Sequence, residues 1–101
     1  HLSHICSGER VLQVNELLKK LASYKSDITI ICGDFNAQPN SLEISKMHKN
    51  RFFCHNQETT HRDNLILDYI FIKSRHQLKV SYKVTMQEYS DHKCLTASIR
   101  W

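Results

Sequence analysis

A short apolar run that ends in a glycine and two polar residues constrains the fold of this chain more than any other feature. Residues 28–32 are almost all apolar and mostly β-branched, which predicts a strand buried on both faces. Gly33 ends the run and lets the backbone turn, so Asp34 and Asn36 are expected just past the strand end, where open α/β sheets bind ligands. A carboxylate and a carboxamide there suit a hard metal ion and a phosphate oxygen. The same residues also favour a plain turn, and both interpretations stay open on this stretch alone.

The length and charge of the chain set its outer limits. With 101 residues it is one small domain at most. A net charge of +4 favours an anionic partner. We find no apolar run long enough for a membrane span and no signal-peptide pattern. Four scattered cysteines are typical of a reducing compartment, so an intracellular location, cytoplasmic or nuclear, is expected.

Two helices are expected, one before and one after the first strand along the chain. Ser7 is a candidate cap for the first helix, in which apolar residues recur at intervals of three and four: Val11, Val14, Leu18 and Leu21. Asn40 is a candidate cap for the second helix, with Glu43 reaching back to it as in a capping box. A helix that leads directly into a buried strand is typical of α/β proteins. The basic stretch at the end of the second helix (residues 46–51) suggests a solvated helix end or, as an alternative, a nucleic-acid patch.

The second half of the chain predicts three further strands. A polar loop over His55–Asn64 precedes an apolar strand over Leu65–Ile72, which Asp68 interrupts. An unpaired carboxylate on that face would cost several kcal/mol, so Asp68 should have a partner. Apolar and polar residues then alternate over residues 78–84 and 94–101, which indicates two half-exposed strands.

Four short motifs, taken together, resemble a known family. They are His1-Leu2, Gly33-Asp34-Phe35-Asn36, Leu67-Asp68-Tyr69-Ile70-Phe71 and Ser90-Asp91-His92. In this order and spacing they resemble the second half of the endonuclease/exonuclease/phosphatase superfamily, which has the deoxyribonuclease-I-like fold. The resemblance covers essentially the whole chain and implies an α/β fold. Residues 1–101 would form one half of a four-layered α/β sandwich, a mostly antiparallel or mixed sheet with covering helices.

The resemblance also implies a reaction, the divalent-metal-dependent hydrolysis of a phosphoester with Mg²⁺ or Mn²⁺. Asp34 would orient or deprotonate the attacking water and lie at the metal. Asn36 would hold the phosphate and position Asp34, and His1 would contact the phosphate. Asp91 would contact the metal ion, directly or through water.

The remaining two residues implied by the resemblance act as a pair. Asp68 would hold the ring of His92 in the required tautomer and orientation, which supplies the partner that the carboxylate needs. His92 would lie against the phosphate and stabilise its developing charge, or act as the general base. Asp34 and His92 are both candidates for that base.

The substrate class is less constrained by these motifs. The basic charge favours a nuclease acting on DNA or RNA, whose phosphates dominate affinity. A sphingomyelin or inositol phosphate hydrolase on the same fold and a catalytically incomplete remnant are the alternatives. The family's first half, which supplies a metal-binding glutamate, has no counterpart in these residues, so an N-terminal half of the same domain is expected. The 101 residues alone are therefore expected to be inactive and to self-associate through an uncovered apolar face.

Overall fold

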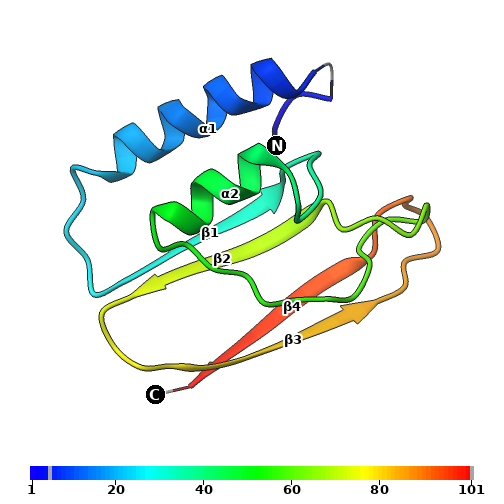
Figure 1. The fold of residues 1–101 in the computed structure, drawn as a ribbon. Helices are drawn as coiled ribbons and strands as arrows, with labels where there is room; N and C mark the ends of the chain where they lie inside the picture. Colours follow the sequence, from blue (N-terminus) through cyan, green and yellow to red (C-terminus); the bar gives the residue numbers. More distant parts are fainter. Residues whose placement is uncertain (5, 101) are drawn as a thin grey trace.

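A computed structural model describes residues 1–4 and 6–100 of the chain. The elements are α1 (Ser7–Leu21), β1 (Ile28–Asp34), α2 (Leu42–Lys49), β2 (Asp68–Ser74), β3 (Lys79–Thr85) and β4 (Cys94–Arg100). Both helices lie on the same side of the β1–β2 pair, and the β3–β4 pair lies on the far side of β2 from β1 (Figure 1).

The strands form two small antiparallel sheets. β1 pairs with β2 so that Asp34 lies opposite Asp68, and β3 pairs with β4 so that Thr85 lies opposite Cys94. The Tyr82 hydroxyl of β3 donates to the Ile70 carbonyl of β2 at 3.1 Å and links the two sheets. The predicted α/β class with antiparallel strands and covering helices is confirmed, as a part of an α/β sandwich.

The core lies between the two helices and the face of the β1–β2 sheet that they cover. Its buried side chains come from α1, α2, β2 and the loops between the elements: Val14, Phe35, Ala37, Ile44, Met47, Phe52, Tyr69 and Phe71. The periodicity that predicted the first helix is confirmed, because Val14 is fully buried and Leu18 and Leu21 pack against this cluster.

The predicted cap of the first helix is wrong. Cys6 occupies the N-cap position without a side-chain cap, and Ser7 is the first residue inside the helix. The Ser7 hydroxyl instead donates to Glu43 Oε1 at 2.9 Å. The side chain that was predicted to cap α1 therefore binds Glu43 on α2 instead.

The predicted cap of the second helix is displaced by one residue. Ser41, not Asn40, is the N-cap, and its hydroxyl accepts from the Ile44 N–H at 3.3 Å. Glu43 does not complete a capping box, because Arg10 Nε donates to its carboxylate at 2.7 Å. Glu43 is 1% exposed, and this ion pair joins α1 to α2.

The first strand is buried on one face only, contrary to prediction. Ile31 packs against the core, but Ile30 is 51% exposed and Cys32 is also exposed. The reason is that the helices cover only one side of the β1–β2 sheet in the part of the chain that is described (Figure 1). The strand also continues through Gly33, so Asp34 is its last residue rather than the first residue of a loop.

The strand predicted over Leu65–Ile72 begins later than expected. β2 starts at Asp68, which therefore opens the strand instead of interrupting it. The two alternating strands are confirmed as β3 and β4, with exposed and half-buried residues in alternation along β3. Trp101, the end of the last predicted strand, lies outside the described residues. Among those residues no helix has the length and apolar character needed to cross a membrane, and the four cysteines are free thiols.

Candidate active site

The loop that carries Asp34 and Asn36 is anchored by the residues between and after them. Phe35 and Ala37 are buried, and the Phe35 ring packs edge-on against Tyr69 with centroids 5.6 Å apart. The Tyr69 hydroxyl donates to the Ala37 carbonyl at 2.6 Å. Burial of the alternate residues leaves Asp34 and Asn36 only partly covered at the end of β1. Core packing therefore sets the place of the polar pair.

Asp34 is the centre of a group of contacts that draws in the N-terminal residues. Its Oδ1 accepts the Asn36 backbone N–H at 2.8 Å, and its Oδ2 lies 3.2 Å from His1 Nε2 and 3.4 Å from His92 Nε2. The Leu2 N–H donates to the Asp34 carbonyl at 2.8 Å, and Asn36 Nδ2 donates to the Leu2 carbonyl at 2.6 Å. Asn36 has φ 48°, a left-handed conformation that asparagine tolerates better than most residues. Three sequence-predicted residues, His1, Asp34 and Asn36, are thus brought together.

His92 bridges two carboxylates. Its Nδ1 lies 2.7 Å from Asp68 Oδ2, so the partner predicted for Asp68 is present. The hydrogen bond with Asp68 raises the pKa of His92; burial opposes this, and the nearby negative charges of Asp68, Asp34 and Asp91 reinforce it. The ring is therefore held between Asp68 on one nitrogen and Asp34 on the other, in the orientation that the sequence analysis required.

A buried threonine supports this pair from behind. The Thr60 hydroxyl accepts the backbone N–H groups of Leu67 and Asp68 at 3.0 and 3.1 Å. Thr60 has no exposed surface. The start of β2, and with it the Asp68 carboxylate, is consequently tied to the loop over residues 55–64.

Asp91 lies beside a histidine that the sequence analysis did not single out. Its Oδ2 is 3.4 Å from His61 Nε2, and the His61 ring packs edge-on against His92 at 4.9 Å between centroids. Partial burial alone would raise the pKa of Asp91, but the hydrogen bond from His61, its own backbone N–H and the charges of the two histidines hold that pKa below its usual value. The sequence placed a polar loop here, and only the fold brings its histidine to Asp91.

Within the described residues, two groups of side chains at this site could hold a metal ion. One consists of Asp34, Asp68 and His92 and the other of His61, Asp91 and His92, with the ligand atoms of each group within 4.8 Å of one another. Asp34 and Asp91, the two residues predicted to lie at a metal, thus fall in different groups that share His92. Carboxylate oxygens suit a hard divalent cation that keeps several of its waters, so the residues present fit Mg²⁺ or Mn²⁺.

Comparison with known proteins gives one finding. A model of the Endonuclease/Exonuclease/phosphatase family matches residues 3–92. No curated protein and no solved structure matched the chain. The matched range holds every site residue described above except His1 and Leu2, which precede it.

Proposed function

The chain belongs to the endonuclease/exonuclease/phosphatase family, and from this premise we propose that it is a metal-dependent nuclease. Family membership supports phosphoester hydrolysis in general. The observation that carries the proposal of metal-dependent hydrolysis is the line of side chains Asp68, His92 and Asp34, joined at 2.7 and 3.4 Å, with Asp34 at the end of β1 and Asp68 at the start of β2. A carboxylate, an imidazole and a second carboxylate in this order can orient a water molecule and carry a proton.

Each residue of this line has a separate task in the proposed reaction. Asp68 holds the His92 ring, so that His92 Nε2 faces Asp34 and the space beside it. Asp34 orients the attacking water with the oxygen that faces the two histidines, because its other oxygen is occupied by the Asn36 N–H. His92 stabilises charge on the phosphate, and His1, which lies 3.2 Å from the same Asp34 oxygen, contacts the phosphate.

The family is generally divalent-metal dependent, and we assign Asp91 and Asp34 as the metal-binding carboxylates of this chain. The bound cation would neutralise charge on the phosphate and activate water. Both carboxylates are accessible to a cation, with Asp91 61% and Asp34 12% exposed at the side chain. Mg²⁺ needs only one or two protein carboxylates beside the substrate phosphate.

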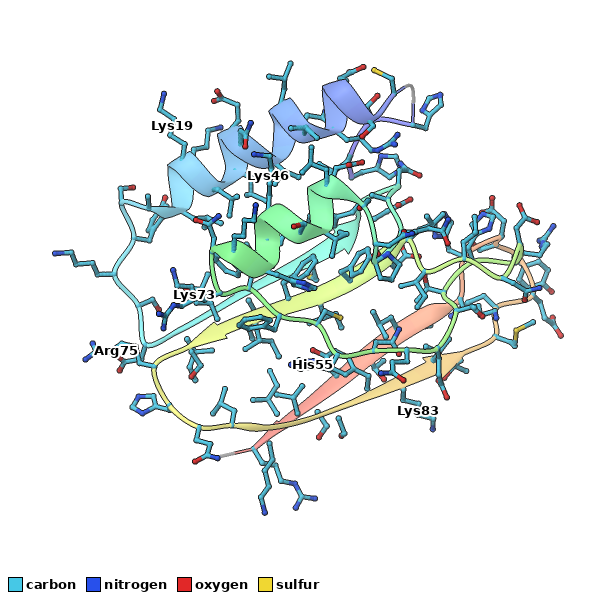
Figure 2. All side chains as sticks on the ribbon, in the orientation of Figure 1. Lys19, Lys46, His55, Lys73, Arg75 and Lys83 are labelled. Atoms are coloured by element: carbon cyan, nitrogen blue, oxygen red, sulfur yellow. The ribbon has the colours of Figure 1, made fainter. Side chains whose placement is uncertain are left out.

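The distribution of charge gives modest support for a nucleic acid. The net charge of +4 is spread over separate elements: Lys19 lies on α1, Lys46 on α2, Lys73 on β2, Arg75 after β2 and Lys83 on β3 (Figure 2). Phosphate contacts dominate the affinity of proteins for nucleic acids. Dispersed cations, however, do not by themselves define a binding surface.

A groove lined by aromatic rings beside α2 gives more specific support. The ring of Phe53 neighbours those of His48 and His55, at centroid distances of 5.6 and 5.9 Å and nearly parallel to the second. All three residues are exposed. A cavity of about 380 Å³ adjoins this row, with Arg51, Phe53, His55 and Tyr82 among its lining residues. Flat exposed rings beside a cation are typical of surfaces that stack the bases of single-stranded nucleic acids.

The polar side chains of this groove argue against a surface that is simply covered by another layer of the protein. Arg51 has no carboxylate partner among the described residues 1–4 and 6–100. Burying an unpaired guanidinium and two imidazoles in a protein core would be costly. Stacking of a nucleobase on Phe53, with Arg51 near its phosphate, would use the polar groups. A lipid chain would use only the apolar lining residues Ile72, Leu78 and Val80.

A second part of the proposal is that these residues form one half of the catalytic domain. The face of the β1–β2 sheet opposite the helices leaves Ile30 51% exposed beside Cys32, which is also exposed. An apolar sheet face of this kind is normally covered by another layer. We therefore expect an N-terminal half of the same domain to cover it and to contribute further metal and phosphate contacts.

The test is hydrolysis by the full-length protein of four substrates: single-stranded RNA, single-stranded DNA, sphingomyelin and an inositol phosphate. We expect Mg²⁺ or Mn²⁺ to support cleavage of a nucleic acid and EDTA to abolish it. The Asp34→Asn variant serves as the inactive control. Cleavage confined to sphingomyelin or the inositol phosphate would refute the nuclease assignment, and no cleavage of any substrate by a folded, metal-loaded protein would refute the hydrolase assignment.

A further inference from the structure

His61 lies at the edge of the site on the loop between α2 and β2. Its side chain is 13% exposed, and its ring lies between Asp91, Asp63 and the ring of His92. Two roles are open to a histidine in this place. It could bind the metal ion itself, or it could hold Asp91 in position for the metal ion.

The hydrogen bonds of the ring decide between these roles. The Asp63 backbone N–H donates to His61 Nδ1 at 3.1 Å, so Nδ1 offers a lone pair and the proton of the neutral ring is on Nε2. Nε2 is the atom that faces Asp91 Oδ2, at 3.4 Å. The Asp63 carboxylate, 3.7 Å from Nδ1, is 75% exposed. Nε2 therefore carries its proton toward Asp91.

A metal ligand would need the opposite arrangement. To bind a cation through Nε2, the ring would have to move its proton to Nδ1, where the Asp63 N–H already points. Although His61, Asp91 and His92 have ligand atoms within 4.8 Å of one another, the backbone therefore selects the donor form of His61.

The main chain also fixes where the ring stands. The Arg62 N–H donates to the Asp91 carbonyl and the Lys93 N–H to the Thr60 carbonyl, both at 2.7 Å, and the His61 N–H donates to the Leu65 carbonyl at 3.0 Å. These bonds align residues 60–62 with residues 91–93 without using the His61 side chain. Replacement of that side chain should therefore leave the loop in place.

We propose that His61 is a positioning residue, which donates its Nε2–H to Asp91 and holds that carboxylate toward the metal ion without binding the ion itself. The inference rests on the proposed function for the metal-binding role of Asp91. Partners of metal-ligating carboxylates typically change metal affinity about 10–100-fold when they are removed.

The experiment compares His61→Leu, which removes the donor, with His61→Gln, whose side-chain amide can donate from nearly the same place. Mn²⁺ affinity of the full-length protein is measured by titration, without substrate. We expect His61→Leu to weaken Mn²⁺ binding about 10-fold or more and His61→Gln to restore most of it. The matched control is His76→Leu, because His76 faces Asp27 beyond the far end of β2.

A second measurement follows the ring directly by ¹⁵N NMR of the full-length protein. We expect His61 to be protonated at Nε2, with and without Mg²⁺, and the Asp91 carboxyl signal to shift in His61→Leu. A proton found on Nδ1, direct coordination of the ion by His61, or unchanged Mn²⁺ affinity in a folded His61→Leu protein would overturn the inference. If His61→Leu weakens metal binding in a protein that cleaves no phosphoester, the positioning role stands and the proposed function fails.

Discussion

The imidazole of His92 and the carboxylate of Asp68 meet at 2.7 Å although the two residues are 24 positions apart in the chain. Asp68 opens β2, and His92 lies in the segment that leads into β4. The other ring nitrogen of His92 faces Asp34 at 3.4 Å. Any rotation of the ring would therefore break its contact with Asp68 or with Asp34. The first prediction depends on this fixed orientation.

Asp68→Asn and His92→Gln should each lower the turnover of the full-length protein strongly, because either change releases the ring from its catalytic orientation. The double variant should lose much less than the sum of the two effects, since the residues act as a unit. Single-turnover rates of the four proteins in the cycle measure this. Strictly additive losses would show that Asp68 and His92 act independently.

Asp34→Asn should lower turnover about 100-fold or more, the usual effect of losing a positioned base or water-orienting group. The change keeps the size of the side chain and the acceptor for the Asn36 N–H, so the midpoint of urea unfolding should change little. Turnover near that of the wild type, with substrate bound normally, would remove Asp34 from the mechanism.

The buried ion pair between Arg10 and Glu43 should govern acid stability. Burial alone would raise the pKa of Glu43, but hydrogen bonds from Arg10, its own backbone and Ser7 hold that pKa below its usual value. A carboxyl whose pKa is depressed on folding stabilises the protein above its unfolded-state pKa, and this contribution is lost as the pH falls through the folded-state value. The free energy of unfolding should therefore decline as the pH drops below about 4.3, the ordinary pKa of glutamate.

The matched variants are Arg10→Met, Glu43→Gln and the double change Arg10→Met with Glu43→Leu. Arg10→Met should cost about 3–5 kcal/mol at neutral pH, because it leaves a buried carboxylate without its cation. The double variant should recover much of this loss, and Glu43→Gln should flatten the decline in acid. Urea unfolding across the pH range tests all three, and an Arg10→Met protein as stable as the wild type would show that the pair contributes nothing.

Phe53→Leu and Arg51→Gln should weaken the binding of a single-stranded oligonucleotide to the full-length protein. Loss of one stacked base costs about 1–3 kcal/mol. Fluorescence anisotropy in EDTA measures binding without cleavage, with Tyr89→Leu as a control, because Tyr89 is 97% exposed and outside the groove. An oligonucleotide without a base at the contacted position should not distinguish Phe53→Leu from the wild type. Equal affinities of all variants for the intact oligonucleotide would remove the groove from the substrate path.

The 101-residue chain by itself should self-associate and should not hydrolyse phosphoesters with Mg²⁺. Self-association is expected because the face around Ile30 lies uncovered on the side of the sheet away from the helices. Sedimentation velocity of the chain and of Ile30→Lys tests this, and the substitution should shift the distribution toward monomer. A wild-type chain that is monomeric and turns over substrate would show that these residues hold a complete site.

Local sequence was sufficient for the helices, most of the strands and the anchoring of the site. The β-branched run over residues 28–32 predicted β1 because such side chains prefer the extended backbone. The buried Phe35 and Tyr69 hold the loop of Asp34 in place, and both belong to the motifs that indicated the family. The pairing of Asp68 with His92 was implied by the resemblance to the family, and the residues themselves indicated only that Asp68 needs a partner.

The helix caps could not be predicted from local sequence, for a physical reason. Asn40 and Ser41 have similar capping preferences, so propensity cannot choose between neighbours. Ser7 and Glu43 could each have capped a helix locally. Instead Ser7 of α1 donates to Glu43 of α2, and Glu43 also accepts from Arg10 of α1. A buried ion pair outweighs the small free-energy difference between two possible caps.

By itself, the sequence determined the α/β class and the family, because these depend on short-range patterns of side chains. Only the tertiary structure decided that one face of β1 is open, since an apolar run does not say how many layers cover it. Only the tertiary structure brought His61 to Asp91, since the alignment of residues 60–62 with residues 91–93 depends on backbone hydrogen bonds between distant segments. Such pairings depend on the packing of the whole chain, and no local preference of the residues involved specifies them.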